Sequence, residues 1–155
     1  MTKHIVFDCD GTLLNTREAK YSLYPGIKEL LKELTSKNLL YIWTARDRAS
    51  VLRVLKDLEV IHYFENTWTV DDGLAKPHIF GLVQMLGKTS KEAICVIGDS
   101  SQDMLGAKNF NVLAIGAIWN TETKAQTLKD AGADFIVSHP SECSSIIQLN
   151  LKAES

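Results

Sequence analysis

Four aspartates in two pairs are the residues of this chain best suited to chemistry. Asp8 and Asp10 lie two residues apart near the N-terminus, and Asp99 and Asp103 form a second pair far along the chain. Carboxylates that gather in one place repel one another, and they stay ionised only when a cation neutralises them. Because such a set offers oxygen donors without His or Cys, it favours a hard ion, and Mg²⁺ is the cofactor we expect.

The sequence also holds donors suited to an anion. Thr44 offers a hydroxyl, Lys76 an ammonium group, and loop N–H groups complete a set that suits the equatorial oxygens of a phosphoryl group. A carboxylate can itself attack phosphorus and form an aspartyl phosphate, which divides one difficult displacement into two. A second carboxyl two residues later can protonate the leaving oxygen and afterwards activate water. These residue types therefore predict phosphoryl transfer.

The hydrophobic pattern predicts the elements that must bring these residues together. Short apolar runs alternate with segments of helical period, which is typical of parallel βαβ units. Helices are expected from Pro25, over residues 51–58, from Pro77, after Asp99, up to about Ala131 and over residues 141–149. The helix that ends near Ala131 is expected to be capped by Thr121 or Thr123. The expected strands are residues 4–7, 39–43, 67–70, 93–97, 112–115 and 135–137.

The candidate residues lie where these strands end. Asp8 follows the first strand, Thr44 follows the second, and Asp99 follows residues 93–97, while Lys76 stands in a loop before a helix. In an open parallel sheet, ligands bind outside the carboxyl ends of the strands. We therefore expect one site at this edge, with Lys76 and Asp99 within ~10 Å of Asp8, so that one ion and one phosphoryl group can bridge them.

Length and composition exclude several classes of protein. The chain has 155 residues, which favours a single domain over residues 1–155, and its net charge of −2 argues against nucleic acid or an anionic membrane surface as a partner. No apolar run approaches the ~20 residues that cross a bilayer. Three cysteines without a CxxC pair indicate reduced thiols and a cytoplasmic protein.

Four motifs resemble, in order, those of the haloacid dehalogenase-like (HAD) phosphohydrolase superfamily. Residues 7–13, Phe-Asp-Cys-Asp-Gly-Thr-Leu, are similar to the first motif, and Thr44 in the run 43–46 is similar to the second. Lys76 followed by proline is similar to the third motif, and residues 98–103 are similar to the fourth. The resemblance implies a three-layer Rossmann-like α/β fold, in which helices cover both faces of a parallel sheet.

The resemblance also implies a role for each matching residue. Asp8 would be the nucleophile and a metal ligand, and Asp10 the general acid and base, which also binds the metal through its backbone carbonyl. Asp99 would bind Mg²⁺ as well, while Asp103 would support the metal or its waters without binding the ion directly. The implied activity is Mg²⁺-dependent hydrolysis of a phosphate monoester through an aspartyl phosphate. Three residues would hold the phosphoryl group: Thr44, Ala45 and Lys76.

The chain leaves no room for a sizeable cap domain, the insertion through which members of the superfamily select substrates. Residues 13–24 suffice only for a short flap, and the second insertion point offers just five residues, 71–75. The site would be open to a small phosphorylated metabolite or to a larger molecule, and a homo-oligomer could supply a lid. Arg17 or Lys20 of the flap could contact a second anionic group, although both also suit an ordinary solvated surface, and Arg46 is a candidate substrate contact.

Two other functions compete with hydrolysis. A receiver-like phosphoacceptor also combines a parallel sheet, an aspartyl phosphate, Mg²⁺, a Thr or Ser and a Lys, but its acceptor aspartate ends the third strand, whereas here Asp8 ends the first. A non-catalytic binding subunit with the same fold is the second alternative. The complete set of motifs argues against it, because a scaffold has no need for crowded acidic side chains.

Overall fold

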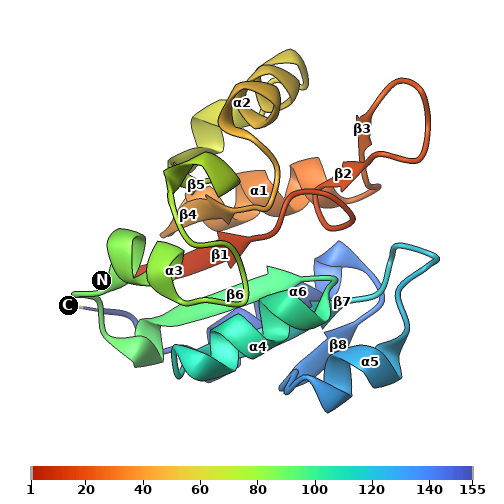
Figure 1. The fold of residues 1–155 in the computed structure, drawn as a ribbon. Helices are drawn as coiled ribbons and strands as arrows, with labels where there is room; N and C mark the ends of the chain where they lie inside the picture. The colour runs from red at the N-terminus through yellow and green to blue at the C-terminus, as the bar shows by residue number, and fades with distance from the viewer. Residues whose placement is uncertain (1, 155) are drawn as a thin grey trace.

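A single parallel sheet organises the chain. The computed structural model describes residues 2–154, and its six-stranded sheet has the order β5-β4-β1-β6-β7-β8 with every pairing parallel (Figure 1). The strands are β1 Lys3–Phe7, β4 Asn38–Trp43, β5 Phe64–Trp68, β6 Ile94–Gly98, β7 Leu113–Ala117 and β8 Phe135–Val137. The chain runs outward from β1 to β5 and then returns to place β6 on the other side of β1. The carboxyl ends of β1 and β6 therefore flank the point where the strand order reverses, which is where sheets of this kind bind ligands.

Helices cover both faces of this sheet, as the sequence predicts. Side chains of α1, α2 and α6 belong to one hydrophobic core and those of α3, α4 and α5 to the other (Figure 1). Side chains along β1 alternate between the two faces of the sheet: Ile5 and Phe7 belong to the first core and Val6 to the second. The helices are α1 Ile27–Thr35, α2 Arg48–Asp57, α3 Phe80–Leu86, α4 Ser101–Asn109, α5 Ala125–Asp130 and α6 Cys143–Asn150. Short 3₁₀ turns lie at Ile61–Tyr63, Val70–Asp72, Lys91–Ala93 and Pro140–Glu142. None of the helices in residues 2–154 is long and apolar enough to cross a membrane.

A small antiparallel hairpin occupies the segment expected to form a flap. Strands β2 (Leu14–Asn15) and β3 (Ser22–Leu23) pair with each other and stand beside the sheet. Leu13 and Leu14 are fully buried, and the backbone N–H groups of both donate to the carbonyl of Cys9. The base of the hairpin is thus fixed to the end of β1, while its tip, residues 17–20, is exposed.

Three local predictions were wrong. The helix expected at Pro77 begins at Phe80, because the N–H of Phe80 is capped by Nδ1 of His78. The strand expected at residues 67–70 is β5, which ends at Trp68 because Thr69 starts a capped 3₁₀ turn. Neither threonine caps α5: its N-cap is Lys124, and the hydroxyl of Thr121 accepts a hydrogen bond from Arg17 instead.

The three cysteines are expected to resist alkylation in the folded protein. Cys9, Cys95 and Cys143 are free and fully buried, and burial raises the pKa of each thiol, to about 12 for Cys143. Because the thiolate is the reactive form, a thiol reagent should modify almost none of them near pH 7.5 and all three after unfolding. A titration with the thiol reagent, with and without denaturant, counts the reactive cysteines in the folded and the unfolded protein. Rapid reaction of the native protein would contradict the burial of the thiols.

Candidate active site

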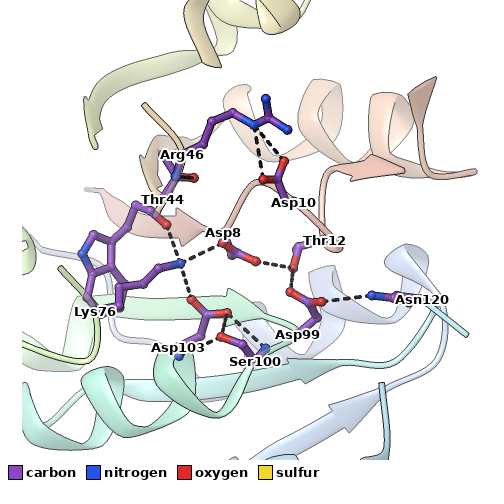
Figure 2. Close-up of polar contacts among 11 residues, drawn as sticks. Asp8, Asp10, Thr12, Thr44, Arg46, Lys76, Asp99, Ser100, Asp103 and Asn120 are labelled. Atoms are coloured by element: carbon purple, nitrogen blue, oxygen red, sulfur yellow. Dashed lines mark hydrogen bonds and ion pairs between the residues drawn. The ribbon is translucent and has the colours of Figure 1, made fainter. Parts of the chain in front are cut away.

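A buried lysine joins two aspartates at the carboxyl edge of the sheet. Nζ of Lys76 lies 2.8 Å from Oδ1 of Asp8, 2.7 Å from Oδ1 of Asp103 and 3.0 Å from the carbonyl oxygen of Trp43 (Figure 2). The lysine side chain is only 7% exposed. Burial opposes its charge, but the two carboxylates outweigh burial and raise the pKa of Lys76. The site therefore contains a permanent cation at its base.

Asp8 lies at the centre of the site, directly after β1. Its backbone N–H donates to the carbonyl oxygen of Ile97 at 3.0 Å, which ties the end of β1 to β6. The residue is buried, and burial raises the pKa of its carboxyl to about 7, against the opposing charge of Lys76 and with a further contribution from Asp99. A second cation would restore the ionised form that a nucleophile needs.

Asp99, directly after β6, faces Asp8 across a shared threonine. Oγ1 of Thr12 lies 3.3 Å from Oδ2 of Asp8 and 3.1 Å from Oδ1 of Asp99, so its single hydrogen serves one carboxylate at a time (Figure 2). Nδ2 of Asn120 donates to Oδ2 of Asp99 at 3.1 Å. Gly11 lies against Asp99 and has φ +86°. A Cβ at this position would lie 2.1 Å from Oδ2 of Asp99, so the close approach of the backbone to this carboxylate requires glycine.

Asp103 is fixed by the start of α4. Its side chain accepts hydrogen bonds from Oγ of Ser100 at 2.8 Å and from the N–H of Ser100 at 3.2 Å, and Ser100 in turn caps the helix. Burial and the charge of Asp8 raise the pKa of Asp103 to about 6, although Lys76 opposes the rise. The oxygens of Asp103 are thus engaged by Ser100 and by the ammonium of Lys76.

The donor set fits a hard divalent cation. One carboxylate oxygen from each of Asp8, Asp99 and Asp103 lies within 4.8 Å of the other two. Of these three acids, Asp8 and Asp103 share the ammonium of Lys76, whereas the contacts to Asp99 come from the neutral side chains of Thr12 and Asn120. Clustered oxygen donors with excess negative charge are the surroundings that Mg²⁺ prefers.

Mg²⁺ is expected to raise the thermal midpoint of unfolding more at about pH 8 than at about pH 5.5. The pKa values of Asp8 and Asp103, about 7 and about 6, exceed that of an unfolded aspartate, so the folded state binds extra protons. Stability without metal therefore falls as the pH rises through these values, and the cation binds best once the protons have left. Thermal scans with Mg²⁺ or EDTA measure the difference, and equal shifts at the two pH values would contradict it.

The side chain of Asp10 is turned away from this cluster. Nε of Arg46 contacts its two carboxylate oxygens at 3.0 and 3.2 Å (Figure 2). The metal contact expected of Asp10 is through its backbone carbonyl, so its carboxyl would not be a metal ligand. The sequence brought Asp10 to the right loop but did not reveal its ion pair with Arg46.

Thr44 follows β4 and lies on the same edge of the sheet. Its N–H donates to the carbonyl oxygen of Trp68 at 3.0 Å, and its Oγ1 accepts the N–H of Arg46 at 3.0 Å. Because Oγ1 accepts that bond, the hydroxyl hydrogen remains available to donate to an anion. Ala45 lies between these residues, in the loop that leads into α2.

Three residues of the site were not assigned a role from the sequence. Thr12 and Ser100 lie inside motifs but act through side-chain hydrogen bonds that spacing does not predict. Asn120 follows β7, so the strand-end rule applied to that strand would have found it. The flap residue Arg17, a candidate for anion contact, instead pairs with Glu122 at 3.3 Å.

Comparisons with known proteins agree with the family expected from the motifs and with the fold. The family model described as "Haloacid dehalogenase-like hydrolase" matches residues 17–117. A haloacid dehalogenase-like family hydrolase of Streptococcus pneumoniae is 22% identical, with a TM-score of 0.81 over 94% of this chain and 98% of that one. A predicted phosphatase of Clostridium acetobutylicum is 18% identical, with a TM-score of 0.83 over 95% and 98%. The HAD-type protein YfnB of Bacillus subtilis, in a magnesium-bound structure, is 19% identical, with a TM-score of 0.72 over 81% and 56%. At these identities the likeness is one of fold. A search of curated proteins gave no match.

Proposed function

Because the chain belongs to the haloacid dehalogenase-like hydrolase family, we propose that it hydrolyses phosphate monoesters with the help of Mg²⁺, through a phosphorylated Asp8. One observation carries the proposal: the Asp8 carboxylate lies 2.8 Å from a buried ammonium, in a group of carboxylates that each have one oxygen within 4.8 Å of the others. A lone turn-forming aspartate has no need for such surroundings. A nucleophilic carboxylate that must approach an anionic substrate needs two cations beside it, here the ammonium of Lys76 and the Mg²⁺ that the carboxylates would hold.

In the first step, an oxygen of Asp8 attacks phosphorus as the bond between phosphorus and the bridging oxygen breaks. Asp10 gives its proton to the departing oxygen, so that an alcohol rather than an alkoxide leaves. Lys76 at the base of the site stabilises the negative charge on the equatorial oxygens. The product of this step is an acyl phosphate on Asp8.

In the second step, water attacks the phosphorus of this acyl phosphate. Asp10, now deprotonated, takes a proton from the water, and the bond between phosphorus and Asp8 breaks to release inorganic phosphate. Mg²⁺, held by Asp8, Asp99 and the Asp10 carbonyl, would supply positive charge that offsets the repulsion between anionic nucleophile and substrate. The hydroxyl of Thr44 and the N–H of Ala45 would hold the remaining phosphoryl oxygens.

The substrate is proposed to enter an open site. Among the described residues, the segments at the sheet edge near Asp8 are short: the hairpin at residues 14–23, the loop after β7 that brings Asn120 to Asp99, and the loop before Lys76, which holds a 3₁₀ turn. Both insertion points thus lack a cap domain in this chain. The site accepts a phosphate monoester without enclosing its leaving group.

Hydrolysis is tested with a panel of phosphorylated metabolites and an aryl phosphate. We expect phosphate release that requires Mg²⁺, stops with EDTA and returns when excess Mg²⁺ is added. A rapid-quench experiment should find the transferred phosphate on the peptide that contains Asp8. A stable phosphorylated protein without turnover would favour a phosphoacceptor instead, and the absence of both phosphate release and labelling would refute the proposal.

A further inference from the structure

Arg46 lies at the rim of the site, where its partner is the proposed acid and base. Its Nε contacts both carboxylate oxygens of Asp10, at 3.0 and 3.2 Å (Figure 2). The arginine side chain is 16% exposed and that of Asp10 is 44% exposed, so the pair stands partly in water at the mouth of the site. In the substrate-free protein, the group that must transfer a proton is therefore bound to a cation.

Two further contacts hold the guanidinium independently of Asp10. Nη1 donates to Oγ of Ser50, in the first turn of α2, at 3.1 Å. Cζ lies 5.1 Å from the ring centre of Tyr21, which lies between the hairpin tip and β3. Arg46 can thus keep its place when Asp10 moves. A fixed, planar and partly desolvated guanidinium is a strong donor to a carboxylate or phosphate.

Two other cations around the site have partners that do not need to move. Lys76 is enclosed by two buried aspartates at the base of the site. Arg48 pairs with Asp72 and also donates to the backbone carbonyl of Thr67. Arg46 differs from both, because its acidic partner is the residue that must turn toward the substrate.

We infer that Arg46 exchanges Asp10 for an anionic group on the leaving-group part of the substrate. This inference rests on the proposed function. A carboxylate or second phosphate near the ester oxygen takes the guanidinium, and the released Asp10 carboxyl turns toward the bridging oxygen. The released Asp10 carboxylate takes a proton from solvent and gives it to that oxygen as the P–O bond breaks and the bond from Asp8 to phosphorus forms. With an uncharged leaving group, Asp10 stays on Arg46 and the bond breaks more slowly. Arg46 is thus a positioning and specificity residue.

The probes are two pairs of esters that differ only in this charge. Glycerol 3-phosphate carries CH₂OH where 3-phosphoglycerate carries a carboxylate, and 2-hydroxyethyl phosphate bears the same relation to 2-phosphoglycolate. For the wild-type protein with Mg²⁺, kcat/KM should be higher for the anionic member of at least one pair by about tenfold or more, as one charge-assisted hydrogen bond provides. An absence of preference in both pairs would overturn the inference.

Arg46→Gln should change the two members of a pair in opposite ways. The variant loses kcat/KM on the anionic ester but keeps or gains kcat on the uncharged one, because Asp10 is no longer held. The ratio of kcat/KM for the anionic ester to that for the uncharged ester therefore falls toward one. Arg46→Lys, which keeps the charge but not the planar fork, restores part of the preference. Arg53→Gln, an exposed arginine on α2, is the matched control and leaves the ratio unchanged. Equal losses on both esters would show that Arg46 merely supports the fold, which overturns the exchange.

Binding separates this inference from the proposed function. In Asp8→Asn, calorimetry should still find tighter binding of the anionic ester than of its uncharged counterpart, and adding Arg46→Gln should remove the difference. Turnover that depends on Asp8 but ignores Arg46 refutes only the exchange. A complete absence of turnover refutes the proposed function, while the binding comparison still decides whether Arg46 recognises the anion.

Discussion

Asp8→Asn is expected to reduce phosphatase turnover by about 10³-fold or more, since the variant loses the group that forms the bond to phosphorus. The fold should survive, because Lys76 keeps its contacts to Asp103 at 2.7 Å and to the Trp43 carbonyl at 3.0 Å. Steady-state assays with an aryl phosphate, together with thermal unfolding of the same samples, measure the two effects.

Asp57→Asn provides the matched control for that experiment. It makes the same chemical change at an exposed position at the end of α2, and it should leave turnover within about twofold of wild type. Substantial activity in Asp8→Asn would exclude the aspartyl-phosphate mechanism, whatever the control shows.

Lys76→Met is expected to lower the free energy of unfolding by about 3–5 kcal/mol at about pH 7.5 and to abolish turnover. The substitution leaves the buried carboxyls of Asp8 and Asp103 without their shared cation. Burial already raises the pKa of Asp8 to about 7 and that of Asp103 to about 6 with the lysine present, and its loss raises both further. Both carboxyls then bind protons more tightly in the folded than in the unfolded state, so the stability deficit shrinks as the pH falls toward 5.

Denaturant unfolding of Lys76→Met at the two pH values measures this deficit. Lys56→Met, at an exposed position on α2, is the control and should change stability by less than about 0.5 kcal/mol. Adding Asp103→Asn to Lys76→Met removes one of the unpaired charges and should recover part of the loss. A deficit that is the same at both pH values would show that lost packing, rather than charge, dominates.

The sequence predicted a parallel sheet with helices on both faces and the meeting of Asp8, Lys76 and Asp99, because the rule about strand ends places both aspartates at one edge of the sheet. An apolar run that ends in a polar residue fixes where that residue lies in a parallel sheet, and in the structure Asp8 at such an end lies 2.8 Å from Lys76. The catalytic roles of these residues are part of the proposed function.

The side-chain contacts of the site that the sequence missed lie in loops. Asp10 turns to Arg46, and Asn120 turns to Asp99, through side-chain rotations that no strand alternation controls. The start of α3 at Phe80 was misplaced for a related reason: Pro77 suits the first turn of a helix, but a local hydrogen bond to His78 places that turn three residues later. Local propensity describes such segments less well than it describes β1 or α1.

The hydrogen bond from Thr12 to Asp99 joins residues 87 positions apart in the chain. It depends on the pairing of β1 with β6, so neither half of the polypeptide holds a working centre by itself. Closing so long a loop is entropically costly and belongs to the slow part of folding. During refolding, catalysis should therefore return no sooner than the two halves have joined, and a truncated chain that stops before residue 94 should be inert.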